Sequence, residues 1–328
     1  AFCFPDTYEI GMSNVGMRIL YGLMNQVEGV WCERVFAPWG DMEEEMRKHH
    51  LPLWALESQD PMEDFDMIAF SIGYEMAYSN VLNMLELGHI PLKASDRGDS
   101  LRHMVFAGGT SVYNAEPMAD FLDFCVEGEG EDVNLEVLEC YRSAKRRGLD
   151  RHSFLLEVSK IPGVYVPSLY RHTYREDGTI REIIPLEGAP KTVTKRIVQD
   201  MDKAYYPVNP IVPSTQIIHD RTVLELFRGC IRGCRFCQAG FCYRPVRPKS
   251  PERLYELGVK SLENAGYSEM TLSSLSTSDY KKLGEFADKM LDYCNPRGIS
   301  LSLPSLRADN FSVELMQKVQ QVRKSGLT

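Results

Sequence analysis

The chain has 328 residues, of which 44% are hydrophobic and 25% charged, and its formal net charge is −9. This composition is that of an ordinary globular protein, and the length allows two domains with separate cores. The negative balance argues against a generally basic surface that coats nucleic acid, and no apolar run is long enough for a transmembrane helix. Nine cysteines in a chain of this length do not indicate a disulfide scaffold.

Residues 1–147 alternate between short apolar runs and segments of helical periodicity. The apolar runs predict strands at residues 1–4, 30–38, 67–72, 103–109 and 123–131. The helical segments are 14–27, 41–50, 76–87 and 131–146, and Asp41 is the expected N-cap of the second. Strands that alternate with helices predict a parallel sheet covered on both faces, so we expect a doubly wound, Rossmann-like α/β domain.

Ligands of such sheets bind beyond the carboxyl ends of the strands. The residues there are Asp6, Tyr8 and Gly11 after the first strand, Ser71 at the third, and Gly108 and Gly109 at the fourth. Their order resembles that of cobalamin-binding domains, in which the first turn reads Asp-x-His-x-x-Gly, and this resemblance implies that they contact cobalamin. Tyr8 replaces the histidine, and a phenol is a poorer cobalt ligand than an imidazole. Either cobalamin binds without a protein ligand to cobalt, or the domain keeps the fold alone, since glycines also serve tight turns.

Residues 148–220 are expected to connect two domains. Seven prolines interrupt this segment, and helical periodicity disappears. Residues 164–185 predict a β-hairpin that turns at Glu176-Asp177-Gly178. The segment resembles the connector that follows such cobalamin-binding domains, and a solvated linker with one hairpin is the alternative.

The βα rhythm returns in residues 221–328. Strands are predicted at 222–227, 269–274 and 299–305. A helix is expected after each strand. The first runs from Pro251, which Ser250 precedes, to about residue 265, and the second is capped by Thr277-Ser278-Asp279 and runs to about residue 293. The third covers residues 313–324 with Ser312 as its cap. Three βα units of this kind predict half of a parallel (β/α) barrel, whose functional residues lie at the carboxyl ends of the strands.

Cys230, Cys234 and Cys237 follow the first of these strands in a C-x3-C-x2-C spacing. Three thiolates so close together can converge on one inorganic centre, either an Fe–S cluster or zinc. On a [4Fe–4S] cluster, three cysteines leave one iron without a protein ligand, and that iron can bind a substrate or cofactor. The alternative is a zinc knot with Cys242 as fourth ligand, although zinc modules favour paired C-x2-C knuckles.

The spacing, with Phe236 directly before the third cysteine, resembles the signature of the radical S-adenosylmethionine (SAM) superfamily. The resemblance implies that the free iron chelates SAM, that Phe236 packs beside the adenine, and that reductive cleavage releases methionine and a 5′-deoxyadenosyl radical. Ser273 and Ser274 occupy the slot of a Gly-Gly-Glu-type motif that pairs with the SAM amino group, and Ser305 and Arg307 end the third strand at the barrel mouth. For these four residues, turn and capping roles are the alternative.

Radical SAM cores resemble a partial barrel of six βα units, so we expect this chain to be a piece of a longer polypeptide whose half barrel has an unpaired edge. The resemblance also implies an electron donor of the flavodoxin or ferredoxin type. Because a cluster needs reduced thiols, we expect a cytoplasmic protein. The substrate cannot be read from the sequence. The alternatives are cobalamin-dependent methylation or methylthiolation of RNA or protein, and, in a different class, a non-catalytic zinc-binding module.

Overall fold

The computed structural model describes residues 1–213, 215–310 and 313–322. The chain divides into two compact units, Ala1–Val198 and Gln199–Thr328, and each is described by itself. The division falls inside the segment that we expected to be a connector. Among the described residues, no helix combines the length and the apolar character needed to cross a membrane.

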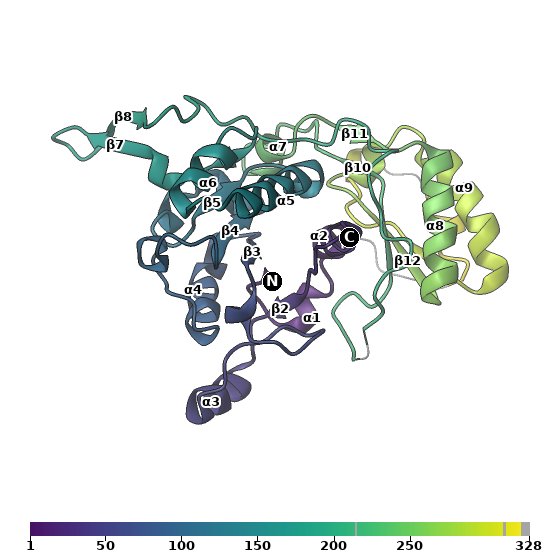
Figure 1. Ribbon diagram of the computed structural model, residues 1–328. Helices are drawn as coiled ribbons and strands as arrows, with labels where there is room; N and C mark the ends of the chain where they lie inside the picture. Colours follow the sequence, from purple (N-terminus) through teal and green to yellow (C-terminus); the bar gives the residue numbers. More distant parts are fainter. Residues whose placement is uncertain (214, 311–312, 323–328) are drawn as a thin grey trace. The chain divides into compact units, whose positions relative to one another are not determined.

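The first unit is built on a six-stranded sheet in the order β2-β1-β3-β4-β5-β6 (Figure 1). Its strands are β1 (Phe2–Phe4), β2 (Arg34–Phe36), β3 (Met67–Ser71), β4 (Met104–Gly108), β5 (Phe124–Val126) and β6 (Val164–Tyr165). The first five are parallel, and β6 joins the edge antiparallel to β5. This is the strand order of doubly wound folds with a switch point between β1 and β3.

Alternate residues of the central strands enter two separate cores. Ile68 and Phe70 lie in a core with Met46 of α3 (Gly40–His49) and Met84 of α4 (Tyr78–Leu87). Phe106 and Phe124 lie in the other core, which also contains residues of α5 (Gly130–Arg147) and α6 (Arg151–Val158). Helix α2 (Val15–Met24) contacts α5. Helices therefore cover both faces of the sheet, and the predicted doubly wound fold is confirmed.

Two local expectations for this unit are wrong. Helix α6 lies where we expected no helix: its N-cap, Asp150, accepts a hydrogen bond from the Ser153 amide (2.7 Å), and Phe154, Leu155 and Val158 are buried. Helix α3 begins at Gly40 after Trp39, so Asp41 is not the N-cap. Asp41 lies in the first turn instead, where a carboxylate is still favourable for the helix dipole.

The predicted hairpin is present. Strands β7 (Tyr170–Tyr174) and β8 (Ile180–Pro185) pair antiparallel, and the Gly178 amide donates to the Arg175 carbonyl across the turn (3.0 Å). Gly178 has φ +81°, which explains the glycine at that position.

The second unit holds three parallel strands in the order β13-β12-β9. They are β9 (Thr222–Glu225), β12 (Glu269–Ser273) and β13 (Ser300–Ser302), and the helices that contact them are α8 (Pro251–Ala265), α9 (Leu283–Cys294) and α10 (Val313–Val319). Helix α8 begins at Pro251 as predicted, and Ser250 caps it, because the Ser250 hydroxyl accepts from the Arg253 amide (3.2 Å). The predicted cap Ser312 lies outside the described residues.

One face of this small sheet is buried and the other is polar. Leu224, Leu272 and Leu301 are buried, while Thr271, Ser273 and Ser302 on the alternate positions are only partly buried. Gly258 of α8 brings the helix against the buried face, since a Cβ there would lie 3.2 Å from Met270 and 3.4 Å from Leu224. This arrangement is that of successive βα units, whose helices cover one face of the parallel sheet.

Candidate functional site

The three motif cysteines lie on a loop whose two ends are held together. We call residues 229–246 the cysteine loop. It leaves from β10 (Phe227–Arg228) and returns through β11 (Arg247–Pro248), and these two strands pair antiparallel. At its start, Gly229 has φ +96°, and a Cβ there would lie 2.5 Å from the Tyr243 and Pro245 carbonyl oxygens. Only glycine fits that close approach of backbone.

One partly buried carboxylate holds both ends of the cysteine loop. Glu225, the last residue of β9, accepts from Arg228 Nε (2.9 Å) before the loop and from Lys249 Nζ (2.9 Å) after it. Burial raises the pKa of Glu225, but the adjacent Lys249 and Arg228 cations outweigh this effect and lower it to about 2. Glu225 was missed in the sequence, although a charged residue in an otherwise apolar strand before the motif is a usable signal.

Within the loop, Arg232 reaches the turn that follows β12. Its guanidinium binds the Asp279 carboxylate through two hydrogen bonds, one of them Nε to Oδ2 at 2.9 Å. The Arg232 hydrogen bond lowers the pKa of Asp279 to about 2. Asp309, beyond β13, lies 3.7 Å from Arg232 and binds Arg307 at 2.8 Å. The loop is thereby tied to the carboxyl ends of all three parallel strands.

Thr277-Ser278-Asp279 was expected to cap the next helix, and this prediction is wrong. The three residues form a separate 3₁₀ turn, and α9 begins later, after Lys282. The reason is that this turn bonds elsewhere: the Thr277 amide donates to the Ser305 carbonyl (3.1 Å) and Ser278 Oγ accepts from the Arg307 amide (3.2 Å). The turn is therefore a fixed junction between the ends of β12 and β13.

All three cysteines are free thiols of intermediate burial. The Cys237 amide donates to the Cys234 carbonyl (3.0 Å), and the Arg232 amide donates to Cys230 Sγ (3.4 Å). In the described ranges, no three His, Cys, Asp or Glu side chains are already arranged to hold a metal ion. The donors nevertheless fit a cluster by their chemistry, because thiolates are the ligands of Fe–S centres and amide donors to sulfur are typical around them. Coordination requires the thiol side chains to turn toward one another within the loop.

The other predicted SAM contacts are placed as follows. Phe236 is 93% exposed, so its ring is available to a ligand. The Ser273 carbonyl accepts from the Leu226 amide (2.9 Å), and Ser274 Oγ lies 2.9 Å from Thr277 Oγ1. Ser305 is exposed with φ +57°, and Arg307 is engaged by Asp309. Ser274, Ser305 and Arg307 thus meet around the turn at 277–279, whereas Phe236 stands apart on the loop.

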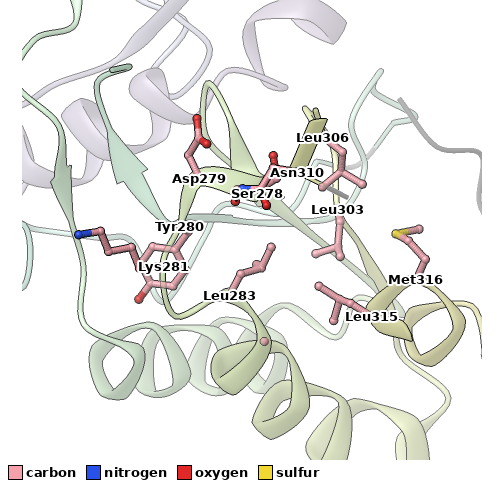
Figure 2. Close-up of a pocket in the computed structure, with 11 residues that line it drawn as sticks. Ser278, Asp279, Tyr280, Lys281, Leu283, Leu303, Leu306, Asn310, Leu315 and Met316 are labelled. Atoms are coloured by element: carbon pink, nitrogen blue, oxygen red, sulfur yellow. Dashed lines mark hydrogen bonds between the residues drawn. The ribbon is translucent and has the colours of Figure 1, made fainter. Parts of the chain in front are cut away.

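Two cavities flank this turn. One of about 570 Å³ is lined by Cys230 and Ile231 of the loop together with Ser276 and Tyr280, a size typical of ligand sites. The other, of about 400 Å³, is lined by Leu283 of α9 and Met316 of α10 together with the polar residues Ser278, Asp279 and Asn310 (Figure 2). Figure 2 shows the Asp279 carboxylate pointing away from Leu283 and Leu315, which line that second cavity. Asp279 lines both cavities, and its carboxylate binds Arg232 of the loop.

In the first unit, the residues expected to contact cobalamin lie at the carboxyl edge of the sheet. Ser71 and Gly108 are paired neighbours at the ends of β3 and β4. Asp6 Oδ2 accepts from the Tyr74 hydroxyl (3.2 Å), and Tyr8 begins α1 (Tyr8–Gly11) with its ring 5.4 Å from that of Phe36. The parallel strands thus bring the predicted residues to one edge.

Two of these glycines have structural reasons of their own. A Cβ on Gly11 would lie 2.2 Å from Cε1 of Phe36. Gly109 has φ +106°, and a Cβ there would lie 2.4 Å from the Ile72 carbonyl oxygen. Gly108, by contrast, has room for a methyl group, since its nearest neighbour is the Val126 oxygen at 3.6 Å. Packing accounts for Gly11 and Gly109 whether or not a cofactor binds.

Glu127 is a further titratable group at this edge, directly after β5. Burial raises its pKa to about 7. Its amide donates to the Gly163 carbonyl (2.7 Å), and its carbonyl accepts from the Arg196 amide (2.9 Å). These contacts fix the backbone of Glu127 between β6 and the chain near residue 196.

Comparison with known proteins gives three kinds of match. Residues 16–167 match a family model described as "Radical SAM proteins, N-terminal". The uncharacterized protein MJ0966 of Methanocaldococcus jannaschii is 24% identical over 320 residues, which are 97% of this chain and 57% of that protein. The chain therefore spans little more than half of this relative.

Solved structures share the fold along nearly the whole chain. The radical SAM methyltransferase TsrM from Kitasatospora setae, with cobalamin and a [4Fe–4S] cluster bound, matches with a TM-score of 0.59 at 10% identity, over 99% of this chain and 57% of that one. The cobalamin-dependent SAM radical enzyme OxsB, with aqua-cobalamin and SAM bound, matches with a TM-score of 0.52 at 14% identity, over 92% and 38%. Residues 16–167 are thus similar to the N-terminal family of radical SAM proteins, and the chain shares its fold with solved cobalamin-binding radical SAM enzymes.

Proposed function

We propose that this chain is the cluster-bearing part of a radical SAM enzyme, in which Cys230, Cys234 and Cys237 hold a [4Fe–4S] cluster. The observation that carries the proposal is the placement of three free thiols on one closed loop, at the carboxyl end of the first strand of a parallel βα sheet. This end of such sheets is where β/α barrels carry their active sites. Three ligands leave the fourth iron for the amino and carboxylate groups of SAM.

The cluster would supply one electron, obtained from a donor of the flavodoxin or ferredoxin type, to the sulfonium of SAM. With both groups bound, this electron would cleave the C5′–S bond of SAM to give methionine and a 5′-deoxyadenosyl radical, which would take a hydrogen atom from the substrate. In this proposal the exposed Phe236 ring covers the adenine, and Ser273, Ser274, Ser305 and Arg307 surround the rest of SAM. Because the thiols must stay reduced, we place the protein in the cytoplasm.

Anaerobic reconstitution with iron and sulfide tests this function. We expect about four irons per chain, a brown protein, and 5′-deoxyadenosine after reduction with dithionite in the presence of SAM. Iron content is measured first, because the cysteine loop alone can supply the ligands even though the chain spans 57% of its relatives. A colourless protein with one zinc per chain would overturn the proposal in favour of a zinc-binding module.

We further propose that the first unit binds cobalamin without a bond from Tyr8 to cobalt. Two observations support this: the ends of β3 and β4 lie paired at one edge, and the Tyr8 ring packs edge-on against Phe36. Hydroxocobalamin retention, followed by absorbance after gel filtration, is the test. We expect Tyr8→Phe to retain as much cobalamin as the wild type, with an unchanged spectrum. A wild type that retains none, or a Tyr8→Phe variant with a shifted spectrum, would contradict the proposal.

Cobalamin-dependent methyl transfer is the second candidate reaction, because one structural neighbour is a radical SAM methyltransferase and both are cobalamin-dependent. The acceptor would be RNA or protein. SAM labelled in its methyl group distinguishes this reaction, since transfer places the label in the macromolecule, whereas reductive cleavage alone leaves it in methionine.

A further inference from the structure

Asp279 lies on a turn that is fixed from several sides. Thr277 is fully buried, and its hydroxyl lies 2.9 Å from Ser274 Oγ. Ser278 accepts from the Arg307 amide (3.2 Å), and its carbonyl accepts from the Asn310 side chain (2.6 Å). Asp279 itself is only 10% exposed at its side chain. The backbone that carries Asp279 is therefore held by residues that follow β12 and β13, outside the cysteine loop.

Arg232 connects this fixed carboxylate to a thiol. It lies between Cys230 and Cys234, and its guanidinium is bound by both oxygens of Asp279. Its own amide donates to Cys230 Sγ (3.4 Å). A two-pronged arginine–carboxylate pair restricts the guanidinium in both position and orientation, unlike a single exposed ion pair. Fixing the Arg232 side chain at its far end also limits how the peptide before it can turn.

We propose that Asp279 is a positioning residue for the iron–sulfur cluster, because it holds Arg232 so that the Arg232 amide donates to the sulfur of Cys230. This inference rests on the proposed function of the cysteine loop. Groups that orient metal ligands from outside the ligand set commonly change metal affinity 10- to 100-fold when they are removed. Hydrogen bonds to cluster sulfurs also set the reduction potential.

The test compares Asp279→Asn and Arg232→Lys with Asp288→Asn in the reconstituted chain. Asp288 binds Lys318 (3.0 Å) in the same unit, so its variant removes a carboxylate and an ion pair without touching the loop. We expect Asp279→Asn to lose iron to a chelator about 10-fold faster than the wild type. Asp288→Asn should match the wild type.

Arg232→Lys keeps the positive charge and the amide but loses the two-pronged pair. Its reduction potential should move to a more negative value, because a weakened hydrogen bond to Cys230 Sγ no longer stabilises the more negative, reduced cluster. A purely structural role would lower thermal stability and leave this potential unchanged. If circular dichroism shows that Asp279→Asn does not fold, the reduction potential of Arg232→Lys alone tests the inference.

If Asp279→Asn and Arg232→Lys both released iron at the wild-type rate and had the wild-type reduction potential, the inference would be overturned. A wild-type chain that takes up no iron would instead refute the proposed function. The two failures are therefore distinguishable.

Discussion

The Glu225 carboxylate and the Lys249 ammonium group lie 2.9 Å apart, and the Lys249 side chain is 1% exposed. Glu225 ends the first strand of the second unit, whereas Lys249 follows the cysteine loop. The Tyr206 ring lies 5.7 Å from the same ammonium group. A lysine this deeply buried needs its anion, so the two residues stabilise the fold only as a pair.

Glu225→Gln should destabilise the second unit by about 3–5 kcal/mol, because it removes the carboxylate charge that faces the buried Lys249 ammonium group. All three tryptophans (Trp31, Trp39 and Trp54) lie in the first unit, so their fluorescence does not report this change. Hydrogen exchange of α8 and β9 in urea is the measurement. Glu256→Gln is the control, since Glu256 forms exposed pairs with Arg253 and Lys260 and should change stability by less than about 0.5 kcal/mol.

The same carboxylate predicts acid sensitivity. Its pKa is lowered to about 2 in the folded chain, against an ordinary value of 4.5. Stability that depends on ionised Glu225 is therefore complete above about pH 4.5 and is lost as the pH falls toward 2, by an amount of the order of 3 kcal/mol. Exchange of β9 measured from pH 5 to pH 2.5 should accelerate in the wild type. In Glu225→Gln, this acceleration of exchange at low pH should be absent. If exchange of β9 depended on pH equally in the two proteins, Glu225 would not be the group responsible.

Each of Cys230→Ala, Cys234→Ala and Cys237→Ala should abolish the cluster, because two thiolates cannot replace three on one centre. Iron and sulfide per chain after reconstitution are the measurement. Cys242→Ala is the matched control and should bind the cluster as the wild type does. A stable cluster in Cys234→Ala would contradict the ligand assignment, and loss of metal in Cys242→Ala would favour the zinc knot.

Gly109→Ala should destabilise the first unit much more than Gly108→Ala. At Gly109 the added methyl group would lie 2.4 Å from the Ile72 carbonyl oxygen. At Gly108 its nearest neighbour would be the Val126 carbonyl oxygen at 3.6 Å, an ordinary van der Waals distance. We expect a cost of roughly 1–3 kcal/mol or more for Gly109→Ala and under about 1 kcal/mol for Gly108→Ala. Urea unfolding followed by tryptophan fluorescence measures both. If the two variants lost stability equally, packing against Ile72 would not explain Gly109.

The raised pKa of Glu127 predicts that the stability of the first unit falls, rather than rises, with increasing pH. Burial raises its pKa to about 7, so the folded chain keeps the proton to higher pH than the unfolded chain does. The stability that this group contributes is complete below about pH 4.5 and is lost as the pH rises through 7. Unfolding in urea at pH 5 and pH 8 should show the difference, and Glu127→Gln should reduce it. The exposed Glu28→Gln is the control and should leave the wild-type difference intact.

The sequence predicts the parallel sheets well because apolar runs such as Met67–Ser71 alternate with amphipathic helices, and both signals are local. Capping predictions are weaker. Asp41 and Asp279 have the residue type of an N-cap, but Trp39 precedes α3 and Asp279 bonds to Arg232 in another segment. Such contacts between distant residues leave no local pattern.

The residues of the site likewise differ in whether a local sequence pattern reveals them. The cysteines are recognisable because their spacing is short, whereas Glu225 is recognisable only with Lys249, which lies 24 positions away across the loop. Gly11 fits a cofactor motif by spacing, yet the Phe36 ring already explains it. A residue that satisfies a motif and a packing requirement together cannot be assigned to one of them from its position alone.

The pairing of β10 with β11 has a consequence for how metal is acquired. Bringing the two ends of a flexible segment together costs conformational entropy that grows with its length. In the cysteine loop, the β10–β11 pairing and the hydrogen bonds of Glu225 already hold the two ends together before metal binds. Iron then has to order only the turns between the thiols. In zinc fingers, by contrast, the metal must fold the whole domain. The metal-free chain is therefore expected to be a folded acceptor that can be purified in air, reduced and loaded afterwards without passing through an unfolded state.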